Sequence, residues 1–421
     1  MEKRDQQGKM SRRDFAKLSA AAGFAILGSQ AARAEVGNSE TLKIGLLGCG
    51  SRGTGAVRDM INGNDNVQVI ALADVFEDRV EGARAQFEGM DNPKIAINPE
   101  YCFAGLDAYK KICETDIDIL IEGSLPYCRP YHIEAAVDAG KHIFTEKPAA
   151  SDSPGIRQML DAVRRHKEMG LSFVAGTQRR HQQEYVQTVE KIHDGAVGDV
   201  LTLRAYWNGT LPFVHDRNPD WNDLEYRLRN WINYCWTSGD NIVEQHVHNI
   251  DVCNWVVGTH PVAVVASGGR AWKPDEERYG DLYDNFSCDF EYPDGEHMFS
   301  FSRHWNHSHN DVFEEVIGTE GRTRCHALGE SGTNPYVQEH INLVNSIRGT
   351  GPYYHEGEQV TESTLTAIMG RMAAYSGKRI TWDEALNSDI RHVPEDLSFD
   401  KDYPVAPVPV PGVWPDMEGV L

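Results

Sequence analysis

Positive charge is scarce in this sequence, and its cysteines lack the spacing of a metal or redox site. Among 421 residues, 63 Asp and Glu outnumber 41 Lys and Arg, which gives a formal net charge of −22. Nucleic acids and anionic membrane surfaces would repel such a chain, so we exclude both as partners. The eight cysteines include no C-x-x-C pair, which argues against a zinc ribbon. The hydrophobic share of 40% is typical of a soluble globular protein, and the length predicts about two domains.

The first 34 residues have the pattern of an export signal. A twin-arginine motif contains Arg12 and Arg13, an apolar run follows, and Ala32-Arg33-Ala34 matches an A-x-A cleavage site. The apolar run, Leu18 to Leu27, is far shorter than the roughly 20 residues that span a bilayer, so we expect no membrane anchor. We therefore expect residues 1–34 to be a signal peptide and the mature protein to be periplasmic. Because this pathway exports folded proteins from a reducing cytoplasm, we expect buried thiols rather than disulfides.

From Leu42 onward, short apolar runs alternate with glycine turns and helix-like stretches. The runs predict strands at 43–47, 67–73, 117–122, 142–145 and 171–175. Such alternation is typical of a parallel sheet with helices on both faces, in which the strand carboxyl ends and any ligand share one edge. We assign residues 41–177 to this α/β domain.

After residue 177 the pattern changes to alternating polar and apolar residues. The segments joined by turn signals are 200–207, 262–268, 285–292 and 298–305. This alternation predicts an α+β domain over residues 178–385 with a large, open, mostly antiparallel sheet. A helix is expected from Thr361 to Ser376. Residues 386–421 are expected to form an extended C-terminal arm, because Pro and Val are frequent from Tyr403 to Pro415.

A glycine-rich turn joins the first predicted strand to a helix, with the sequence Gly48-Cys49-Gly50-Ser51-Arg52-Gly53. The glycines allow a tight turn and a close approach of a pyrophosphate, which rests on the helix N-terminus. Asp74 follows the second strand, where a carboxylate binds the ribose hydroxyls and repels a 2′-phosphate. The pattern indicates a Rossmann domain that binds NAD in preference to NADP. Arg52 argues against this preference, because a guanidinium beside the ribose would bind the 2′-phosphate of NADP.

Glu146-Lys147-Pro148 follows the predicted strand 142–145, at the same edge of the sheet. Alone, the two charged residues would be a surface salt bridge. Downstream of a dinucleotide fingerprint, they fall where the nicotinamide should lie. We assign Glu146 and Lys147 to the cofactor site, and we add three residues from the preceding strand–helix unit: Ser124, Pro126 and His132.

These motifs together resemble the glucose–fructose oxidoreductase, inositol dehydrogenase and MocA (Gfo/Idh/MocA) family. The resemblance rests on the glycine fingerprint, Gly140-Lys141-His142, Glu146-Lys147-Pro148 and Gly318-Thr319-Glu320-Gly321, and it covers residues 41–385. It implies a Rossmann domain followed by a large open sheet whose face carries a sugar site. We expect a homo-oligomer that forms through this sheet.

The family's D-x-G-x-H element corresponds to Glu244-Gln245-His246-Val247-His248, and its E-K-P lysine corresponds to Lys147. Glu244 stands where the family has Asp, and His246 stands where it has Gly. The longer carboxylate and the added ring are expected to change the pocket, so the substrate cannot be carried over from inositol or glucose enzymes.

Oxidation of a CH–OH group needs a base for the hydroxyl proton and a cation beside the oxygen. We assign His248 as the base, because an imidazole titrates near neutrality. Lys147 is expected to stabilise the oxyanion. Glu244 and His248 share one face if the segment is helical, so we expect the carboxylate to orient the imidazole. Lys147, His248 and Glu244 are therefore the predicted catalytic residues.

Five further residues are candidates for contact with the substrate: Arg180, His181, Tyr185, Trp207 and His246. Arg180 and His181 follow the last Rossmann strand, although a surface pair of arginines is an equally good interpretation. Trp207 can stack on a pyranose ring, although most tryptophans are simply packed.

A group of histidines also allows a metal interpretation: His304, His307 and His309, with His246. Alternation along a strand places histidines on one polar face without a metal, so we assign no metal.

Export restricts the reaction, because the periplasm holds little free NAD. We expect an NAD-dependent oxidoreductase that acts on a CH–OH group of a carbohydrate (a sugar, glycoside or polyol) and recycles a tightly held cofactor. An alternative is a redox-neutral glycosidase or lyase, in which a transient ketone acidifies the neighbouring C–H, the aglycone is eliminated, water adds and the hydride returns. A third possibility is a silent NAD-bound sugar-binding protein, against which the intact Lys147 and His248 argue.

Overall fold

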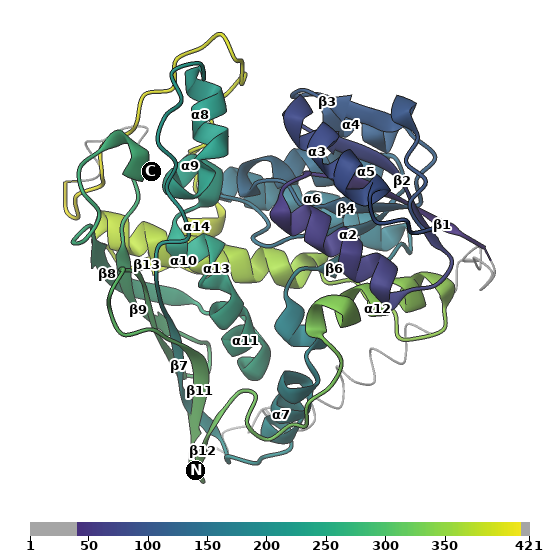
Figure 1. The fold of residues 1–421 in the computed structure, drawn as a ribbon. Coiled ribbons are helices and arrows are strands. Elements are labelled where there is room, and N and C mark those ends of the chain that lie inside the picture. The colour runs from purple at the N-terminus through teal and green to yellow at the C-terminus, as the bar shows by residue number, and fades with distance from the viewer. Residues whose placement is uncertain (1–39, 414–421) are drawn as a thin grey trace, which may run out of the picture. The chain divides into compact units, whose positions relative to one another are not determined.

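The computed structural model describes residues 40–413 of the chain (Figure 1). The expected signal peptide and the last residues of the tail lie outside the described residues. Within residues 40–413, no helix combines the length and the apolar composition that crossing a membrane requires. All eight cysteines lie in this range and are unpaired, and seven of them are buried, which confirms the expectation of thiols rather than disulfides.

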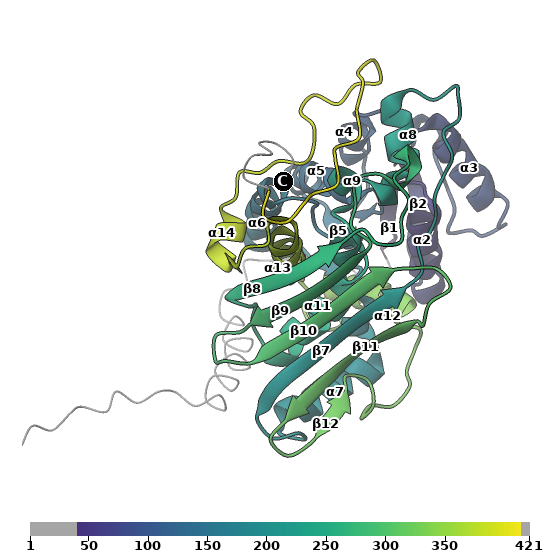
Figure 2. The same ribbon diagram turned by 90° about the vertical axis from the view of Figure 1, so that its left-hand side faces the viewer.

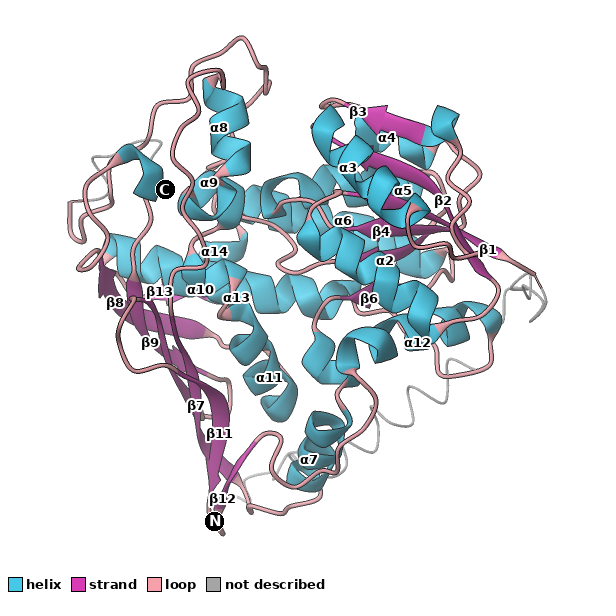
Figure 3. Cartoon of the chain, viewed as in Figure 1, coloured by secondary structure: helices cyan, strands magenta, loops and turns pink. Residues whose placement is uncertain are grey.

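Six parallel strands form the first sheet, in the order β3-β2-β1-β4-β5-β6 (Figure 3). The strands are β1 (Leu42–Leu47), β2 (Val67–Asp74), β3 (Cys102–Ala104), β4 (Ile119–Glu122), β5 (His142–Thr145) and β6 (Phe173–Ala175). The main intervening helices are α2 (Ser51–Gly63), α3 (Glu77–Glu88), α4 (Ala108–Cys113), α5 (Arg129–Asp138) and α6 (Ser153–Glu168). Buried Val, Ile and Leu dominate β1, β2 and β4, as a parallel sheet covered by helices requires. The expected α/β domain is confirmed.

The strand order changes direction at β1, which lies between β2 and β4. In open α/β sheets, ligands bind beyond the carboxyl ends of the strands at such a point. The loops that follow β1 and β4 meet there. A Cβ atom added at Gly48 would lie 2.5 Å from the backbone nitrogen of Ser124, so the two loops are in direct contact.

The second sheet has seven strands in the order β12-β11-β7-β10-β9-β8-β13. They are β7 (Val200–Gly209), β8 (Ala263–Gly269), β9 (Asn285–Glu291), β10 (His297–His304), β11 (Asp311–Gly318), β12 (Arg322–Arg324) and β13 (Ile380–Thr381). All neighbours pair antiparallel except β7 and β10, which confirms the mostly antiparallel sheet. In Figure 2 these strands face the viewer, and α11 (Val247–Val257) and α13 (Gly357–Ser376) lie behind them. Between the sheet and these helices lies a core that includes Leu203, Phe290, Met298 and Ile368.

Further helices complete the second domain: α7 (Gln183–His193), α8 (Asp223–Arg229), α9 (Cys235–Ser238), α10 (Asn241–Glu244) and α14 (Trp382–Leu386). Helix α12 (Pro335–Arg348) packs against α2 and β6 of the first domain. The sequence patterns did not predict α12, β3 or β11 to β13. Strands β3, β12 and β13 have two or three residues, too few to show a period of two. Strand β11 has eight residues, but the adjacent Glu314 and Glu315 interrupt its alternation. The Gly318–Gly321 motif forms the turn between β11 and β12.

Residues 387–413 form a C-terminal arm without helix or strand, and this arm packs against the second domain. The N–H group of Tyr403 donates to Oδ2 of Asp223, and Arg227 donates to the carbonyl oxygen of Tyr403. Further along, the N–H group of Gly412 donates to the carbonyl oxygen of Ser376. The arm is therefore tied to α8 and to the end of α13.

Candidate active site

The loop from Gly48 to Gly53 has the form that a dinucleotide requires. Gly48 has a φ of +94°, which favours glycine, and a Cβ on Gly53 would collide with the carbonyl oxygen of Gly48. A Cβ on Gly50 would meet no atom within 4 Å, so space is open above this residue. Gly50 also caps α2, with no hydrogen bond from a side chain. The N-terminus of α2 can therefore receive an anion, and the loop fits the pyrophosphate of NAD.

A cavity of about 480 Å³ adjoins this loop at Gly50 and Ser51. Arg58 of α2 and Arg79 of α3 line it and contribute positive charge. Asp78 also lines the cavity, but its carboxylate is paired with Arg229 at 2.9 Å. The cavity suits a negatively charged ligand that extends from the glycine loop towards α3.

Asp74 ends β2, and its carboxylate holds the glycine loop. Oδ2 accepts a hydrogen bond from the N–H group of Cys49 at 2.7 Å, and Oδ1 accepts one from the N–H group of Phe76 at 3.0 Å. Burial raises the pKa of Asp74, and these two hydrogen bonds oppose the shift. Each carboxylate oxygen has a further lone pair, so a bond to the ribose remains compatible with this structural role.

Arg52 lies at the opposite end of the site from Asp74. Its Nε is 2.5 Å from Oε1 of Glu146, and its Nη2 is 3.8 Å from Oε1 of Glu339. The guanidinium also lies over the ring of Tyr336, at 4.8 Å. Glu146 follows β5 whereas Asp74 ends β2, and β1 and β4 separate these strands. This position gives no support to the alternative in which Arg52 binds a 2′-phosphate.

His132 and Ser124 belong to a buried network centred on Glu122, at the end of β4. Oε1 of Glu122 lies 3.2 Å from Nδ1 of His132 and accepts from the N–H group of Ser124, and Oε2 accepts from Arg129 at 3.0 Å and from Thr145 at 3.1 Å. Burial would raise the pKa of Glu122, but the bond from His132 and the charge of Arg129 hold it below its ordinary value. The network fixes the loop after β4, which contacts Gly48.

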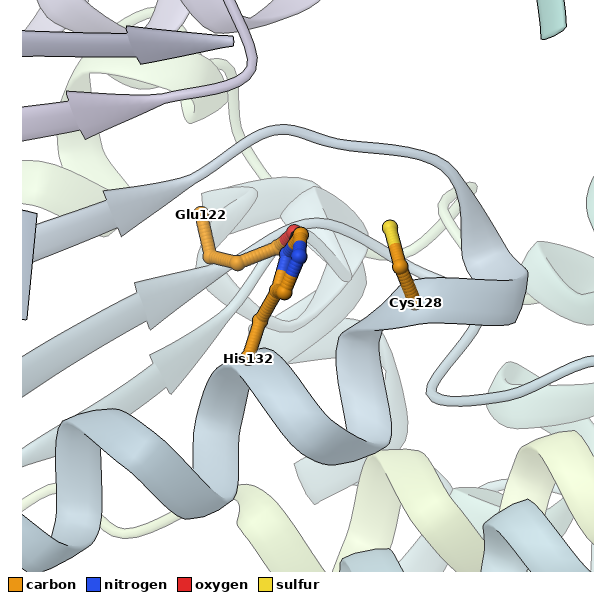
Figure 4. Close-up of side chains that lie close together, drawn as sticks. All are labelled: Glu122, Cys128 and His132. Carbon is orange, nitrogen blue, oxygen red and sulfur yellow. Dashed lines mark hydrogen bonds and ion pairs between the residues drawn. The ribbon is translucent and has the colours of Figure 1, made fainter. Parts of the chain in front are cut away.

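Figure 4 shows the one group of three potential metal ligands found among residues 40–413, namely Glu122, Cys128 and His132, whose ligand atoms lie within 4.8 Å of one another. The guanidinium of Arg129 already forms an ion pair with the carboxylate of Glu122. Cys128, in the 3₁₀ turn Pro126–Cys128, donates from its thiol to the carbonyl oxygen of Leu125 at 3.1 Å, and burial raises its pKa well above the ordinary value. These groups are satisfied within the protein and do not call for a metal.

Lys147, which follows β5, is joined to Glu244 of the second domain. Its Nζ donates to the backbone carbonyl oxygen of Glu244 and to Oε1 at 3.0 Å. Both side chains are only 12% exposed. Oε2 of Glu244 is buried and has no hydrogen-bond partner within the described structure. The structure thus brings an ammonium and a carboxylate together at the ligand edge of the first sheet.

Two buried contacts position the short helix α10, which carries Glu244. Asp240 precedes this helix with a φ of +74°, and its Oδ2 accepts from the hydroxyl of Tyr375 at 2.6 Å. Arg371 of α13 donates to the carbonyl oxygen of Ser151 at 2.8 Å and to that of Gly239 at 2.9 Å. Arg371 thereby links the segment after Lys147 to the turn that starts α10.

The segment from Glu244 to His248 is not one helix. Helix α10 ends at Glu244 and α11 begins at Val247, with Gln245 and His246 between them. In the described part of the chain, no hydrogen bond joins Glu244 to His248, because the carboxylate bonds to Lys147 instead. The expected pairing within a single helix is therefore wrong. Glu244 orients the lysine rather than the imidazole.

His248 is half-buried, and its ring stacks on Trp207 with the centroids 5.9 Å apart. Burial, followed by the positive charges of Lys147 and Arg179, lowers the pKa of His248 well below its ordinary value of 6.5. The ring is therefore neutral at neutral pH and can accept a proton. The indole N–H of Trp207 donates to Oε1 of Gln245 at 2.9 Å. Trp207 thus lies at the site, with the imidazole on one face of its ring.

Two of the other substrate candidates are held by the protein itself. Arg180 donates to Oδ2 and Oδ1 of Asp251 at 2.8 and 3.0 Å. Nε2 of His181 lies 3.2 Å from Oε1 of Glu356, and its Nδ1 lies 2.8 Å from Nδ2 of Asn342. These contacts pair both side chains with other residues of the protein.

Arg179, which the sequence analysis did not assign to the site, is one of two arginines, with Arg52, whose positive charge lowers the pKa of His248. It forms an ion pair with the buried carboxylate of Glu314, which also accepts from the hydroxyl of Tyr185 at 3.0 Å and from Asn249 at 2.5 Å. Tyr185, another substrate candidate, thus supports this pair. Sequence alone could not separate Arg179 from its neighbour, because either could face the cleft after β6.

His246 is fully buried, and its Nε2 lies 2.7 Å from the hydroxyl oxygen of Ser300 on β10. Burial lowers its pKa to about 3, so the ring is neutral. It packs against the sheet, away from any surface that a substrate could reach. Within residues 40–413, the histidines weighed as metal ligands form no such group: His246, His304, His307 and His309.

Known proteins share both domains of this chain. Residues 42–173 match the family model described as an oxidoreductase family with an NAD-binding Rossmann fold, which confirms NAD as the cofactor, and residues 185–324 match the model of the GFO/IDH/MocA C-terminal domain. An inositol 2-dehydrogenase/D-chiro-inositol 3-dehydrogenase from Lactiplantibacillus plantarum is 24% identical over 239 residues, which are 56% of this chain and 57% of that protein. The chain thus spans little more than half the length of this curated relative.

Two solved structures share the fold over most of the chain. Scyllo-inositol dehydrogenase from Lactobacillus casei, with bound NAD(H) and scyllo-inositol, has a TM-score of 0.63 at 18% identity and covers 82% of this chain and 100% of its own. Aldose-aldose oxidoreductase from Caulobacter crescentus, complexed with glycerol, has a TM-score of 0.62 at 18% identity and covers 81% of this chain and 100% of its own.

Proposed function

From the premise that the chain belongs to the GFO/IDH/MocA oxidoreductase family, we propose that it is an NAD-dependent enzyme that oxidises a CH–OH group of a sugar, glycoside or polyol. One observation carries the proposal. Lys147 from the dinucleotide domain and Glu244 from the second domain are hydrogen-bonded, and the charge of Lys147 reaches His248. A cation and a carboxylate therefore meet at the ligand edge of the Rossmann sheet, and the charge of the cation acts on the neutral imidazole of His248.

These residues have distinct tasks at the substrate. Bound NAD supplies a hydride acceptor for the carbon that is oxidised. His248 accepts the hydroxyl proton at a ring nitrogen, and its neutral state at neutral pH leaves that nitrogen free to do so. The ammonium of Lys147 stabilises negative charge on the substrate oxygen. Glu244 holds this ammonium in place through the contact at 3.0 Å.

We also propose that the protein is exported and keeps its cofactor. The export proposal rests on the twin-arginine pattern alone. Retention is supported by an apolar cluster that joins the dinucleotide domain to α8 and to the arm, with Tyr127, Leu228 and Tyr403 among its members. Phe76, which follows β2, lies 6.4 Å from Phe399 of the arm between the ring centroids. In Figure 2 the arm runs beside α8. These contacts would restrain the loops that border the NAD site and would slow the release of NAD.

Among the described residues, no helix covers the outer face of the second sheet (Figure 2), and this supports a homo-oligomer. Val265 and Phe299 project from this face and are 48% and 39% exposed. Tyr206 extends the apolar surface, since it stacks on Phe313 at 4.6 Å and lies 5.1 Å from Phe301. Apolar residues on a broad, uncovered sheet face are typical of an interface. We propose that a second copy of the chain covers it.

The proposed function is tested on the purified protein by the absorbance of reduced nicotinamide after addition of myo-inositol, D-glucose or an aryl glycoside. We expect at least one of these compounds to reduce the bound cofactor. A carbonyl compound that is added afterwards should then reoxidise it. The Lys147→Met variant, which keeps the alkyl chain and loses the charge, is the matched control. An unchanged cofactor and no new product with every compound would refute the proposal.

The same assay separates the alternatives. A redox-neutral glycosidase would release the aglycone without a lasting change in absorbance. A silent binding protein would bind a sugar but form no product. Mass spectrometry of the reaction mixture distinguishes the two outcomes.

A further inference from the structure

Gln245 lies in the gap between α10 and α11, between the carboxylate that holds Lys147 and the buried ring of His246. In the D-x-G-x-H element this is a variable position, so the family pattern assigns it no role. Its side chain is nevertheless held in place. Oε1 accepts from the indole N–H of Trp207 at 2.9 Å and lies 2.8 Å from Nε2 of His304.

The orientation of this amide follows from its partners. An indole N–H group can only donate, so the atom it contacts must be the carbonyl oxygen of Gln245 and not the nitrogen. His304 is 2% exposed, and burial lowers its pKa to about 3, so its ring is neutral. Facing an oxygen, its Nε2 must carry the hydrogen. Two donors therefore fix the carbonyl group, and the amide cannot rotate without losing both bonds.

The NH₂ group of Gln245 then lies on the other side of the amide. The residue is half-buried, and its amide nitrogen has no hydrogen-bond partner in residues 40–413. The preceding residue bonds to Lys147, and Trp207 stacks on His248. Gln245 is thus linked to both groups assigned to the reacting CH–OH, to Lys147 through the neighbouring Glu244 and to His248 through Trp207.

We propose that Gln245 determines specificity by donating a hydrogen bond to a substrate oxygen beside the carbon that is oxidised. The inference rests on the proposed function, because it takes Lys147 and His248 as the markers of that carbon. An NH₂ group selects an acceptor, so the partner is a hydroxyl, ring or carbonyl oxygen rather than an ammonium group. The substrate class is therefore a polyol or sugar with oxygen on the neighbouring carbon.

Two variants separate this role from a structural one. Gln245→Glu keeps the shape of the side chain and an acceptor for Trp207 and His304, but it replaces the NH₂ donor by a carboxylate oxygen. Gln245→Leu removes both functions. A purely structural role predicts that Gln245→Glu behaves like the unmodified protein. The proposed role predicts that both variants lose the preference for a substrate with oxygen on the neighbouring carbon.

Binding is measured by calorimetry on the holoprotein with D-glucose and myo-inositol and with the monodeoxy analogues of each. We expect one analogue to bind the unmodified protein about three- to tenfold more weakly than its parent, as loss of one hydrogen bond implies. This ratio should fall to about one in both variants, with the NAD content unchanged. A ratio that persists in Gln245→Glu would overturn the inference. The expected binding pattern without turnover would support the inference and refute the proposed function.

Discussion

Replacement of Asp74 by alanine tests whether one carboxylate both holds the glycine loop and selects the cofactor. The side chain accepts hydrogen bonds from the N–H groups of Cys49 at 2.7 Å and Phe76 at 3.0 Å. Alanine would remove both bonds and leave two N–H groups of the loop without their partner. The same change would remove the negative charge that is expected to repel a 2′-phosphate.

The expected loss in the free energy of unfolding follows from the two hydrogen bonds and from the burial of the carboxylate, which opposes them. A hydrogen bond to a charged group contributes about 1.5–3 kcal/mol. Burial raises the pKa of Asp74, so desolvation of the carboxylate offsets part of this sum. We expect Asp74→Ala to lower the free energy of unfolding by about 2–4 kcal/mol. Asp74→Asn keeps one acceptor oxygen without the charge and should lower it by about 1–2 kcal/mol.

Urea unfolding of the cofactor-free protein measures the first effect, and titrations with NAD and NADP measure the second. The unmodified protein should prefer NAD, and both variants should narrow that preference. An unfolding free energy for Asp74→Ala within about 0.5 kcal/mol of the parent, as for an ordinary surface substitution, would refute the structural role. Equal affinities for NAD and NADP in the unmodified protein would refute the assignment of Asp74 to cofactor choice.

Four further outcomes are expected. Lys147→Met should lower kcat by about two to four orders of magnitude with NAD binding intact, and a near-normal rate would place the chemistry elsewhere. Because the pKa of His248 is lowered well below 6.5, a plot of kcat/KM against pH should stay flat as the pH falls through 6.5, and a decline that begins above that value contradicts this assignment. Phe299→Asp should yield a monomer in light scattering, whereas an unchanged mass would show that this face of the second sheet is not the oligomer interface. Replacing Arg12 and Arg13 by lysine should leave uncleaved protein in the cytoplasm, and export of that variant would refute the signal.

The parallel sheet could be predicted because its signals are local. Apolar runs such as 67–73 end in a polar residue, Asp74, and a glycine turn lies between the first run and a helix. These features depend on neighbours in the sequence, and the structure has strands at each predicted place. Strand β3 has only three residues, too few to show such a pattern. Helix α12 has local signals that the sequence analysis did not use, since Asn334 caps its N-terminus, Pro335 follows and Gly349 ends it.

The site was predicted less completely, because its contacts depend on tertiary structure. Lys147 and Glu244 could be chosen from their motifs, but their mutual hydrogen bond requires the two domains to be in place. Arg179 and Arg180 are adjacent and chemically alike, yet one acts on His248 while the other pairs with Asp251. No spacing rule distinguishes such neighbours.

The two departures from the family's D-x-G-x-H pattern have different structural consequences. The ring of His246 turns to Ser300 on β10 and is fully buried, so it fills the space beneath the turn and adds nothing to the pocket. The carboxylate of Glu244, by contrast, reaches Lys147 at 3.0 Å. The contact with Ser300 lies at the break between α10 and α11, and across that break the described structure has no hydrogen bond from the carboxylate to His248. Glu244 is thereby directed to the lysine, and the imidazole is left free to accept the substrate proton.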